Sequence, residues 1–209
     1  MKIQVSNESI TTVIDLLRHG DVEGGRKYRG QLDDPLSELG WNQLRTATAN
    51  KQDWQHIITS PLKRCAEFAN ELVQTHSLPL QIEPEFKEVS FGLWEGKTAE
   101  ELLALDAGKI KSYWNDPINI TPPQGENLLD FSKRIITAWD KVLSDFQGQH
   151  VLLVSHAGVM RMIICHILSM PLTELFKLDI GLAKASRIEV IHEAGNNYPR
   201  LVFHGSEFI

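Results

Sequence analysis

The sequence predicts an α/β fold: a three-layer α/β/α sandwich with a mostly parallel central sheet and a small helical and loop insertion over the candidate site. Short apolar runs alternate with longer amphipathic stretches, which is the pattern of βαβ units. With 209 residues, 42% hydrophobic and 23% charged, the chain can bury a sizeable core. We expect a single domain over residues 1–209, with an insertion or lid at about 97–125.

The first half of the chain contains three short runs rich in β-branched and apolar residues. They are predicted as strands and cover residues 11–17, 56–59 and 80–82. Two helices are expected between them. Ser37 is placed to cap the first helix, and Ser60, followed by Pro61 at the first helical position, is placed to cap the second, which runs to about residue 74.

The middle of the chain has a less regular pattern. Residues 86–96 show no clean period and are predicted as an ordered loop, and residues 98–105 as a helix. Residues 106–123 contain three prolines among aromatic and polar residues, so we expect an irregular insertion or lid there.

The second half contains the clearest helix, because apolar residues recur at steps of three and four through residues 126–146. Residues 150–154 are predicted as a strand that leads through 155–158 into an apolar helix ending near 168. Residues 186–191 and 200–203 are predicted as edge or near-edge strands.

Net charge narrows the possible partners. The formal charge of -6 argues against binding to nucleic acid or to an anionic membrane, since both require a basic surface.

The first nine residues lack the apolar core of a signal peptide, and no run is long enough to span a membrane, so we expect a cytoplasmic location. Cys65 and Cys165 lie in apolar helical stretches and are expected to be buried free thiols.

Reactive side chains follow the predicted strands. Ligands of parallel sheets bind beyond the carboxyl ends of the strands, so Arg18, His19, Arg64 and His156 are expected to meet there. Two guanidiniums suit the oxygens of a phosphoryl group. Nearby positive charge should lower the pKa of His19 and keep its imidazole uncharged and nucleophilic, and the Gly20 carbonyl can orient the ring. His156 is then a phosphate ligand.

A departing alkoxide needs a proton donor, and a carboxylic acid in a partly apolar loop is suited to that task. Glu88 and Glu95 both lie in the loop 86–96, among aromatic residues that can keep a carboxyl group protonated. Physical reasoning alone does not choose between them.

Structural roles are also open for several of these residues. Arg64 can form an ion pair with Glu67 three residues later, and Glu95 can be a structural carboxylate that holds the loop 86–96 in place. Asp33-Asp34-Pro35 is typical of a turn, with metal binding as the minor alternative.

Five short motifs occur in an order and spacing that resemble the histidine phosphatase (phosphoglycerate-mutase-like) superfamily. They are 16–20 (LLRHG), 28–40 (YRGQLDDPLSELG), 60–65 (SPLKRC), Glu88 with 91–96 (FGLWEG), and 155–158 (SHAG). The resemblance covers about residues 11–170. It implies a fold of the α/β type and a phosphomonoesterase that needs no metal or other cofactor.

The resemblance also implies roles for individual residues. His19 corresponds to the phosphorylated nucleophile, Glu88 to the proton donor, and Arg18, Arg64 and His156 to the phosphate pocket. We also expect Arg29 and Ala157 to contact the substrate. Members of the superfamily commonly carry asparagine at the position of Gly25 and glutamine at that of Arg29, so the usual side-chain contact at Gly25 is absent here.

Within the superfamily, the variant at 24–30 (GGRKYRG) and the sequence 94–98 (WEGKT) resemble the α-ribazole-5′-phosphate phosphatases of cobalamin biosynthesis. The alternatives are a broad-specificity sugar or small-molecule phosphatase and a cofactor-dependent phosphoglycerate mutase. A metal-dependent hydrolase built on His19 and His156 is disfavoured, because two arginines would repel a cation. The expected partner is a small phosphate monoester, and a homodimer is left open.

Overall fold

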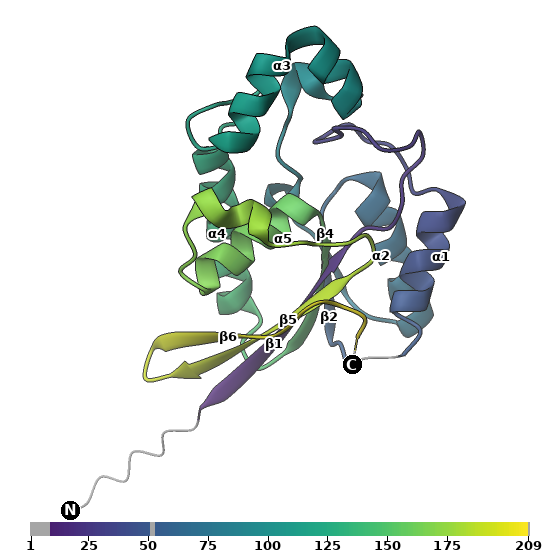
Figure 1. The fold of residues 1–209 in the computed structure, drawn as a ribbon. Helices are drawn as coiled ribbons and strands as arrows, with labels where there is room; N and C mark the ends of the chain where they lie inside the picture. The colour runs from purple at the N-terminus through teal and green to yellow at the C-terminus, as the bar shows by residue number, and fades with distance from the viewer. Residues whose placement is uncertain (1–8, 51–52, 209) are drawn as a thin grey trace, which may run out of the picture.

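A six-stranded sheet in the order β3-β2-β4-β1-β5-β6 forms the centre of the computed structural model, which describes residues 9–50 and 53–208 (Figure 1). The strands are β1 (Ile10–Arg18), β2 (His56–Thr59), β3 (Leu80–Ile82), β4 (His150–Ser155), β5 (Ala185–Glu193) and β6 (Asn196–Ser206). The first four are mutually parallel, whereas β5 is antiparallel to β1 and β6 to β5. The predicted α/β class and mostly parallel sheet are confirmed.

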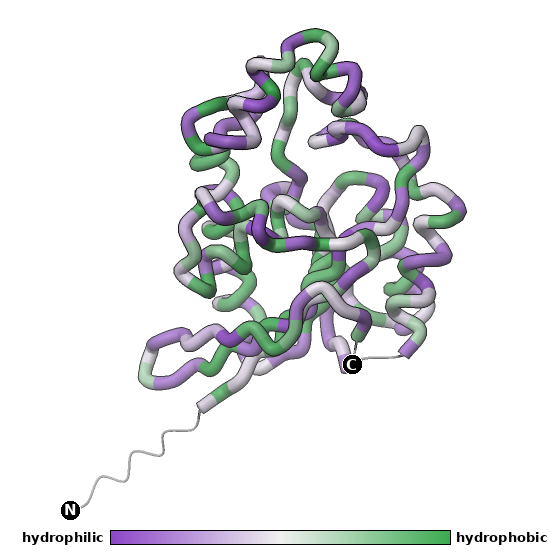
Figure 2. The backbone as a smooth tube through the Cα atoms, in the orientation of Figure 1, coloured by the Kyte–Doolittle hydropathy of each residue, from purple (hydrophilic) through white to green (hydrophobic). Residues whose placement is uncertain are grey.

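Side chains of the inner strands alternate between two buried faces, as expected for a sheet covered on both sides. Leu16 and Leu153 point into the core beneath α4 (Leu128–Asp145) and α5 (Ala157–Ile167). Leu17 and Leu152 point into a second core beneath α1 (Glu38–Ala47) and α2 (Lys63–His76). The two helix pairs flank the sheet in Figure 1, and hydrophobic residues gather along the strands between them in Figure 2. The predicted three layers are therefore present.

The helix α3 (Ala99–Asn115) lies beyond the end of the sheet towards which β1 runs (Figure 1). Thr98 and Glu101 form a capping box at its start, and Asp106, with φ -158 and ψ 83, interrupts it. The prediction of irregular structure from residue 106 was wrong as far as residue 115. Ile110 and Tyr113 bury themselves beside Trp94, and this tertiary packing stabilises a turn that local composition does not favour.

The start of α2 also differs from the prediction. Its N-cap residue is Leu62, which makes no side-chain cap bond, so Ser60 does not cap this helix. Asp33, 30 residues earlier, accepts a hydrogen bond at 2.7 Å from the Lys63 amide and satisfies a free donor of the first turn. Local sequence patterns do not reveal a cap supplied from so far away.

The expectation about a signal peptide concerns residues 1–9, of which 1–8 lie outside the described residues. Within residues 9–50 and 53–208, no helix combines the length and the apolar character needed to cross a bilayer. The single-domain assignment of residues 1–209 stays a prediction.

A buried ionic cluster lies near the start of the parallel strands, away from the predicted site. The Asp15 carboxylate, fully buried on β1, accepts hydrogen bonds from Arg187 at 2.7 and 2.9 Å, His150 at 2.9 Å and Trp54 at 2.8 Å. Burial alone would raise the pKa of Asp15, but the bonds from His150, Arg187 and Trp54 outweigh it and lower the pKa.

The substitution Asp15→Asn is expected to lower the free energy of unfolding by about 3 kcal/mol at pH 7, because it removes a buried carboxylate charge that accepts from Arg187. Since the folded-state pKa of Asp15 is lowered, its contribution is present above the ordinary aspartate pKa of about 4 and is lost as the pH falls below it. Urea denaturation at pH 7 and at pH 3.5 measures both effects. A difference below about 1 kcal/mol at pH 7 would contradict the structural role.

Candidate active site

Three neighbouring strands end at one edge of the sheet and bring two histidines together. Arg18 at the end of β1 pairs with Ser155 at the end of β4, so His19 and His156 follow side by side. The His19 amide donates to the Ser155 carbonyl at 3.0 Å, and the two imidazole centroids lie 5.3 Å apart. This convergence is the one expected for the carboxyl ends of parallel strands.

The His19 ring has a defined tautomer. Its Nδ1 lies 2.8 Å from the Gly20 carbonyl oxygen, and since a carbonyl only accepts, Nδ1 carries the proton. The lone pair therefore resides on Nε2, as the sequence reasoning at Gly20 anticipated. Gly20 itself is required by packing, because a Cβ there would come within 2.3 Å of the Gly40 carbonyl oxygen.

Both imidazoles are held uncharged. Burial is the main cause that lowers the pKa of His19 well below its usual value, and the positive charges of Arg64 and Arg18 lower it further, although the Gly20 hydrogen bond opposes them. Burial also lowers the pKa of His156, again with help from Arg64. An uncharged imidazole with a free Nε2 is a competent nucleophile.

Two arginines supply fixed positive charge beside the rings. The Arg18 Nη1 donates to the Ile180 carbonyl at 2.6 Å, and Arg64, which is 1% exposed, donates to the carbonyls of Leu32 at 2.8 Å and Gly30 at 2.7 Å. In the described part of the chain, the buried Nε atoms of both arginines lack a hydrogen-bond partner. Because the Arg64 guanidinium points at these carbonyls, it forms no ion pair with Glu67. The unpartnered Nε atoms leave the site with buried cationic donors that suit an anion.

His156 is fixed from two sides. Its Nε2 lies 2.7 Å from the Ser60 hydroxyl, and the Cys65 sulfur lies 3.7 Å from the same nitrogen. Sequence reasoning gave Ser60 a capping role and missed this contact, although Ser60 follows a strand end as His19 does. Cys65 is a buried free thiol, as predicted, and burial raises its pKa to about 12, so it stays protonated.

The Glu88 carboxylate is positioned against the start of α5. Its Oε2 accepts from the Gly158 amide at 3.0 Å, and its Oε1 accepts from the Val89 amide at 3.0 Å. A Cβ at residue 158 would come within 2.1 Å of Oε1, so the close approach of Glu88 depends on a glycine there. Glu88 thus lies beside the helix that begins immediately after His156.

Two further residues, which sequence reasoning did not identify, hold the Glu88 loop. The Arg134 guanidinium donates to the Lys87 carbonyl at 2.9 Å and the Glu88 carbonyl at 3.2 Å, and it pairs with Glu126 at 2.6 Å. Both residues fall within the predicted helix 126–146, but helical periodicity says nothing about which loop they reach.

Glu95, the other candidate acid, is engaged in holding its loop. Its Oε1 accepts from the amides of Gln31 at 3.0 Å and Phe91 at 2.9 Å. The structural alternative for Glu95 is therefore the one that the geometry supports, and Glu88 is the carboxylate nearer the histidines' helix.

Arg29 and Ala157, which are also predicted to contact the substrate, lie in separate parts of the structure. Arg29 pairs with Asp34 at 3.1 Å, and its Nη2 donates to the carbonyls of Val22, Glu23 and Gly25. These bonds commit much of its guanidinium to its own loop, although its charge contributes to lowering the pKa of His19. Ala157 is the first residue of α5, and the N-cap residue His156 makes no side-chain cap bond there. Substrate contact by these two residues stays a prediction.

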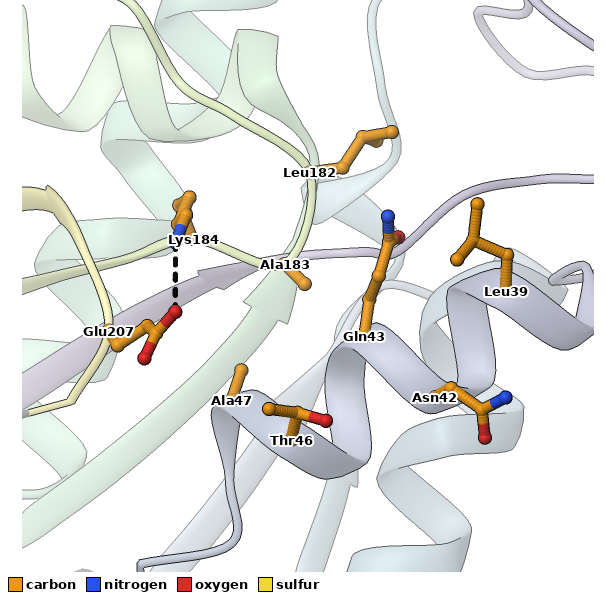
Figure 3. Close-up of a pocket in the computed structure, with 9 residues that line it drawn as sticks. All are labelled: Leu39, Asn42, Gln43, Thr46, Ala47, Leu182, Ala183, Lys184 and Glu207. Carbon is orange, nitrogen blue, oxygen red and sulfur yellow. Dashed lines mark hydrogen bonds and ion pairs between the residues drawn. The ribbon is translucent and has the colours of Figure 1, made fainter.

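A groove of about 390 Å³ lies beside α1, and none of the predicted site residues lines it (Figure 3). Its wall includes Gln43, which accepts from the Asp21 amide at 2.8 Å, and Ala183, whose amide donates to the His19 carbonyl at 3.1 Å. The groove therefore borders the backbone of the histidine loop but holds none of its reactive side chains. Among the described residues, no group of three His, Cys, Asp or Glu side chains is arranged to hold a metal ion.

Comparison of the sequence with known proteins gives a consistent set of matches. A family model described as the histidine phosphatase superfamily (branch 1) matches residues 14–200. The bifunctional protein Rv2228c of Mycobacterium tuberculosis is 31% identical over 192 residues, which cover 90% of this chain and 52% of that protein. The chain thus spans about half the length of this relative.

Two further matches extend over most of both proteins. The adenosylcobalamin/alpha-ribazole phosphatase of Escherichia coli K12 is 31% identical over 173 residues, covering 79% of this chain and 85% of the relative. The solved structure of an alpha-ribazole phosphatase from Shigella flexneri superposes with a TM-score of 0.80 at 25% identity, covering 94% of this chain and 98% of that one.

Proposed function

Because this chain belongs to the histidine phosphatase superfamily (branch 1), we propose that it hydrolyses phosphate monoesters through a phosphohistidine on His19. The observation that carries the proposal is the 2.8 Å bond from His19 Nδ1 to the Gly20 carbonyl, which leaves the Nε2 lone pair free. That nitrogen belongs to a buried, uncharged ring beside Arg18 and Arg64. A nucleophile for phosphorus and donors for its oxygens are thereby combined in one place.

In the first step, His19 Nε2 attacks phosphorus and the bond from phosphorus to the alcohol oxygen breaks. Charge on the equatorial oxygens is stabilised by Arg18 and Arg64, whose donors are already oriented. His156 contributes a further contact to the phosphoryl group. The protonated carboxyl of Glu88 gives its proton to the departing alkoxide, so a neutral alcohol leaves.

In the second step, the Glu88 carboxylate accepts a proton from water as the water oxygen attacks phosphorus. The bond from phosphorus to Nε2 then breaks, its electron pair returns to the imidazole, and inorganic phosphate leaves. Glu88 regains its proton and His19 its lone pair, so the cycle closes without a metal or other cofactor.

The first candidate substrate is α-ribazole 5′-phosphate. The sequence resemblance at 24–30 and 94–98 supports it, as do the names of the relatives from E. coli and Shigella flexneri. Hydrolysis of sugar phosphates and phosphoglycerate mutase activity are the alternatives, because one fold hosts many substrates.

A panel of phosphate monoesters, including α-ribazole 5′-phosphate, sugar phosphates and 3-phosphoglycerate, tests the proposal. Purified protein should release inorganic phosphate, and rapid acid-free quenching should trap labelled phosphate in acid-labile linkage to the protein. Isomerised phosphoglycerate without phosphate release would instead establish a mutase. Absence of both release and label with every ester would overturn the proposal.

The pH dependence of the reaction should reflect the buried nucleophile. Since burial, with the charges of Arg64 and Arg18, lowers the pKa of His19, the ring stays uncharged below the ordinary histidine pKa of about 6.5. We expect the rate of phosphohistidine formation to be maintained as the pH falls from 7.5 to 6, and to decline only in more acidic solution. Quenched-flow measurement of the labelled intermediate over this range checks the result. A decline centred at or above pH 6.5 would contradict it.

A further inference from the structure

Arg161 lies on the face of α5 that the candidate site uses. It follows by three residues Gly158, whose amide binds Glu88, and residues three apart share a helix face. Side chains on a helix lean towards its N-terminus, and the N-terminus of α5 begins immediately after His156. The long Arg161 side chain is therefore directed back towards the site.

The segment that follows η3 (Leu172–Lys177) holds Arg161 next to Arg18. The Arg161 Nε donates to the Leu178 carbonyl at 3.1 Å, and the Arg18 Nη1 donates to the Ile180 carbonyl at 2.6 Å. Burial is the main cause that lowers the pKa of Arg18, and the charge of Arg161 lowers it further although Glu88 acts in the opposite direction, as expected for two guanidiniums that donate to carbonyls two residues apart. The two guanidiniums are consequently neighbours.

Arg161 differs from the other cations that support the site. Arg134 pairs with Glu126 and Arg29 pairs with Asp34, but within residues 9–50 and 53–208 no carboxylate lies within ion-pair distance of Arg161. Its terminal nitrogens make no hydrogen bond to these residues either. One face of the guanidinium lies over the Phe176 ring at 5.9 Å, but the side chain is only partly buried, so its terminal donors remain accessible beside Arg18.

Tyr113 lies in the last turn of α3, which packs through Trp114 against Phe176 of η3. Its ring is buried and packs at 5.4 Å from the Trp94 ring and 6.2 Å from the Phe91 ring, yet its hydroxyl has no hydrogen-bond partner among the described residues. Burial raises the pKa of Tyr113, and the charge of Glu88 raises it further while that of Arg161 acts in the opposite direction. The Trp114 ring, next to Tyr113, packs at 4.5 Å from the Phe176 ring, and the Arg161 guanidinium lies over that same ring at 5.9 Å, so the end of α3 and Arg161 meet at Phe176.

We propose that Arg161 and Tyr113 bind the alcohol part of the substrate and select esters whose alcohol carries a second anionic group, either a carboxylate or another phosphate. The assignment rests on the proposed phosphatase function. Glu88, the proton donor to the leaving oxygen, marks the side on which the alcohol lies, and Arg161 lies one turn further along α5 than Gly158, whose amide binds Glu88. A guanidinium fork matches the oxygens of either anion, so this subsite favours the phosphoglycerate and sugar-phosphate alternatives named above over α-ribazole 5′-phosphate, whose ribose and base carry no negative charge.

Two ester pairs that differ in the anion test this selection. 3-Phosphoglycerate differs from glycerol 3-phosphate in having a carboxylate in place of a hydroxymethyl group, and fructose 1,6-bisphosphate differs from fructose 6-phosphate in one phosphate. The pairs separate recognition of a carboxylate from that of a phosphate. We expect the wild-type kcat/KM to be higher for the anionic member of at least one pair by about 10- to 100-fold.

Arg161→Gln should remove most of this preference, chiefly by raising KM for the anionic ester more than for the neutral one. Arg161→Lys should restore part of the preference, since it keeps the charge. Tyr113→Phe should lower kcat/KM for the preferred anionic ester by about fivefold without loss of thermal stability. Arg45→Gln removes an exposed arginine of α1 and serves as the control for net charge.

The measurements distinguish failure of the subsite proposal from failure of the proposed phosphatase function. Equal wild-type kcat/KM within both pairs, a preference for the neutral esters, or an equal loss for both members in Arg161→Gln would overturn the subsite while phosphate release upholds the phosphatase. If no ester of any kind yields phosphate or a labelled protein, the proposed function and the subsite fall together.

Discussion

Replacement of His19 by alanine is expected to reduce kcat by at least about ten-thousand-fold for every phosphate ester that the protein hydrolyses. The substitution removes the only atom, Nε2, to which the proposed mechanism transfers phosphorus. Water attacking the bound ester directly would have to be positioned without it, although Arg18 and Arg64 would still bind the phosphoryl group. Phosphate release and acid-labile labelling, measured on the same samples, check both consequences.

His166→Ala is the matched control, since His166 is an exposed histidine on α5 and takes no part in the site. It should retain full activity and full labelling. Residual labelling of His19→Ala would show that another side chain accepts phosphorus. The alanine variant should also bind orthovanadate or phosphate, because the cationic donors are unchanged, and loss of this binding would indicate a disrupted pocket rather than a missing nucleophile.

The second large effect is expected for Glu88→Gln. Glutamine keeps the size of the side chain but cannot donate a carboxyl proton, so kcat for alkyl phosphates should fall by about 100- to 10,000-fold. The loss of rate should depend on the leaving group. p-Nitrophenolate leaves without help from an acid, so formation of phosphohistidine from p-nitrophenyl phosphate should fall by no more than about tenfold.

Burst kinetics with the two kinds of ester separate this role from a structural one. If Glu88→Gln slowed phosphorylation by alkyl and aryl esters to the same degree, Glu88 would not be the acid. Glu85→Gln, which alters an exposed carboxylate three residues away, should leave both rates unchanged.

Much of the fold could be predicted because its signals are local. The apolar runs of β1 and β4 and the three-and-four spacing of α4 are visible in the sequence, and hydrophobic periodicity alone indicates which faces are buried. Those strands also suggested the convergence of His19 and His156, since parallel strands end at a common edge. The continuation of α3 beyond Asp106 was missed, because its stability comes from packing against Trp94 and not from its own composition.

Contacts between segments that are distant in the sequence cannot be predicted from local patterns. Ser60 resembles a helix cap in the sequence, yet it binds His156, and Asp33 supplies the cap from 30 residues away. Arg134 and Arg161 look alike on their helices, but one is neutralised by Glu126 and the other has no such partner among the described residues.

Local patterns in the sequence sufficed to predict the order of strands and helices along the chain, the reactive residues at the strand ends, and the family to which these motifs belong. The tautomer of His19, the partner of Ser60, the position of Glu88 against Gly158 and the absence of a carboxylate partner for Arg161 among the described residues became visible only in the folded protein. These two groups of features differ in the distance along the chain over which their causes act. Periodicity and turn chemistry act between near neighbours in the chain, whereas hydrogen bonds and charges act between atoms that only folding brings together.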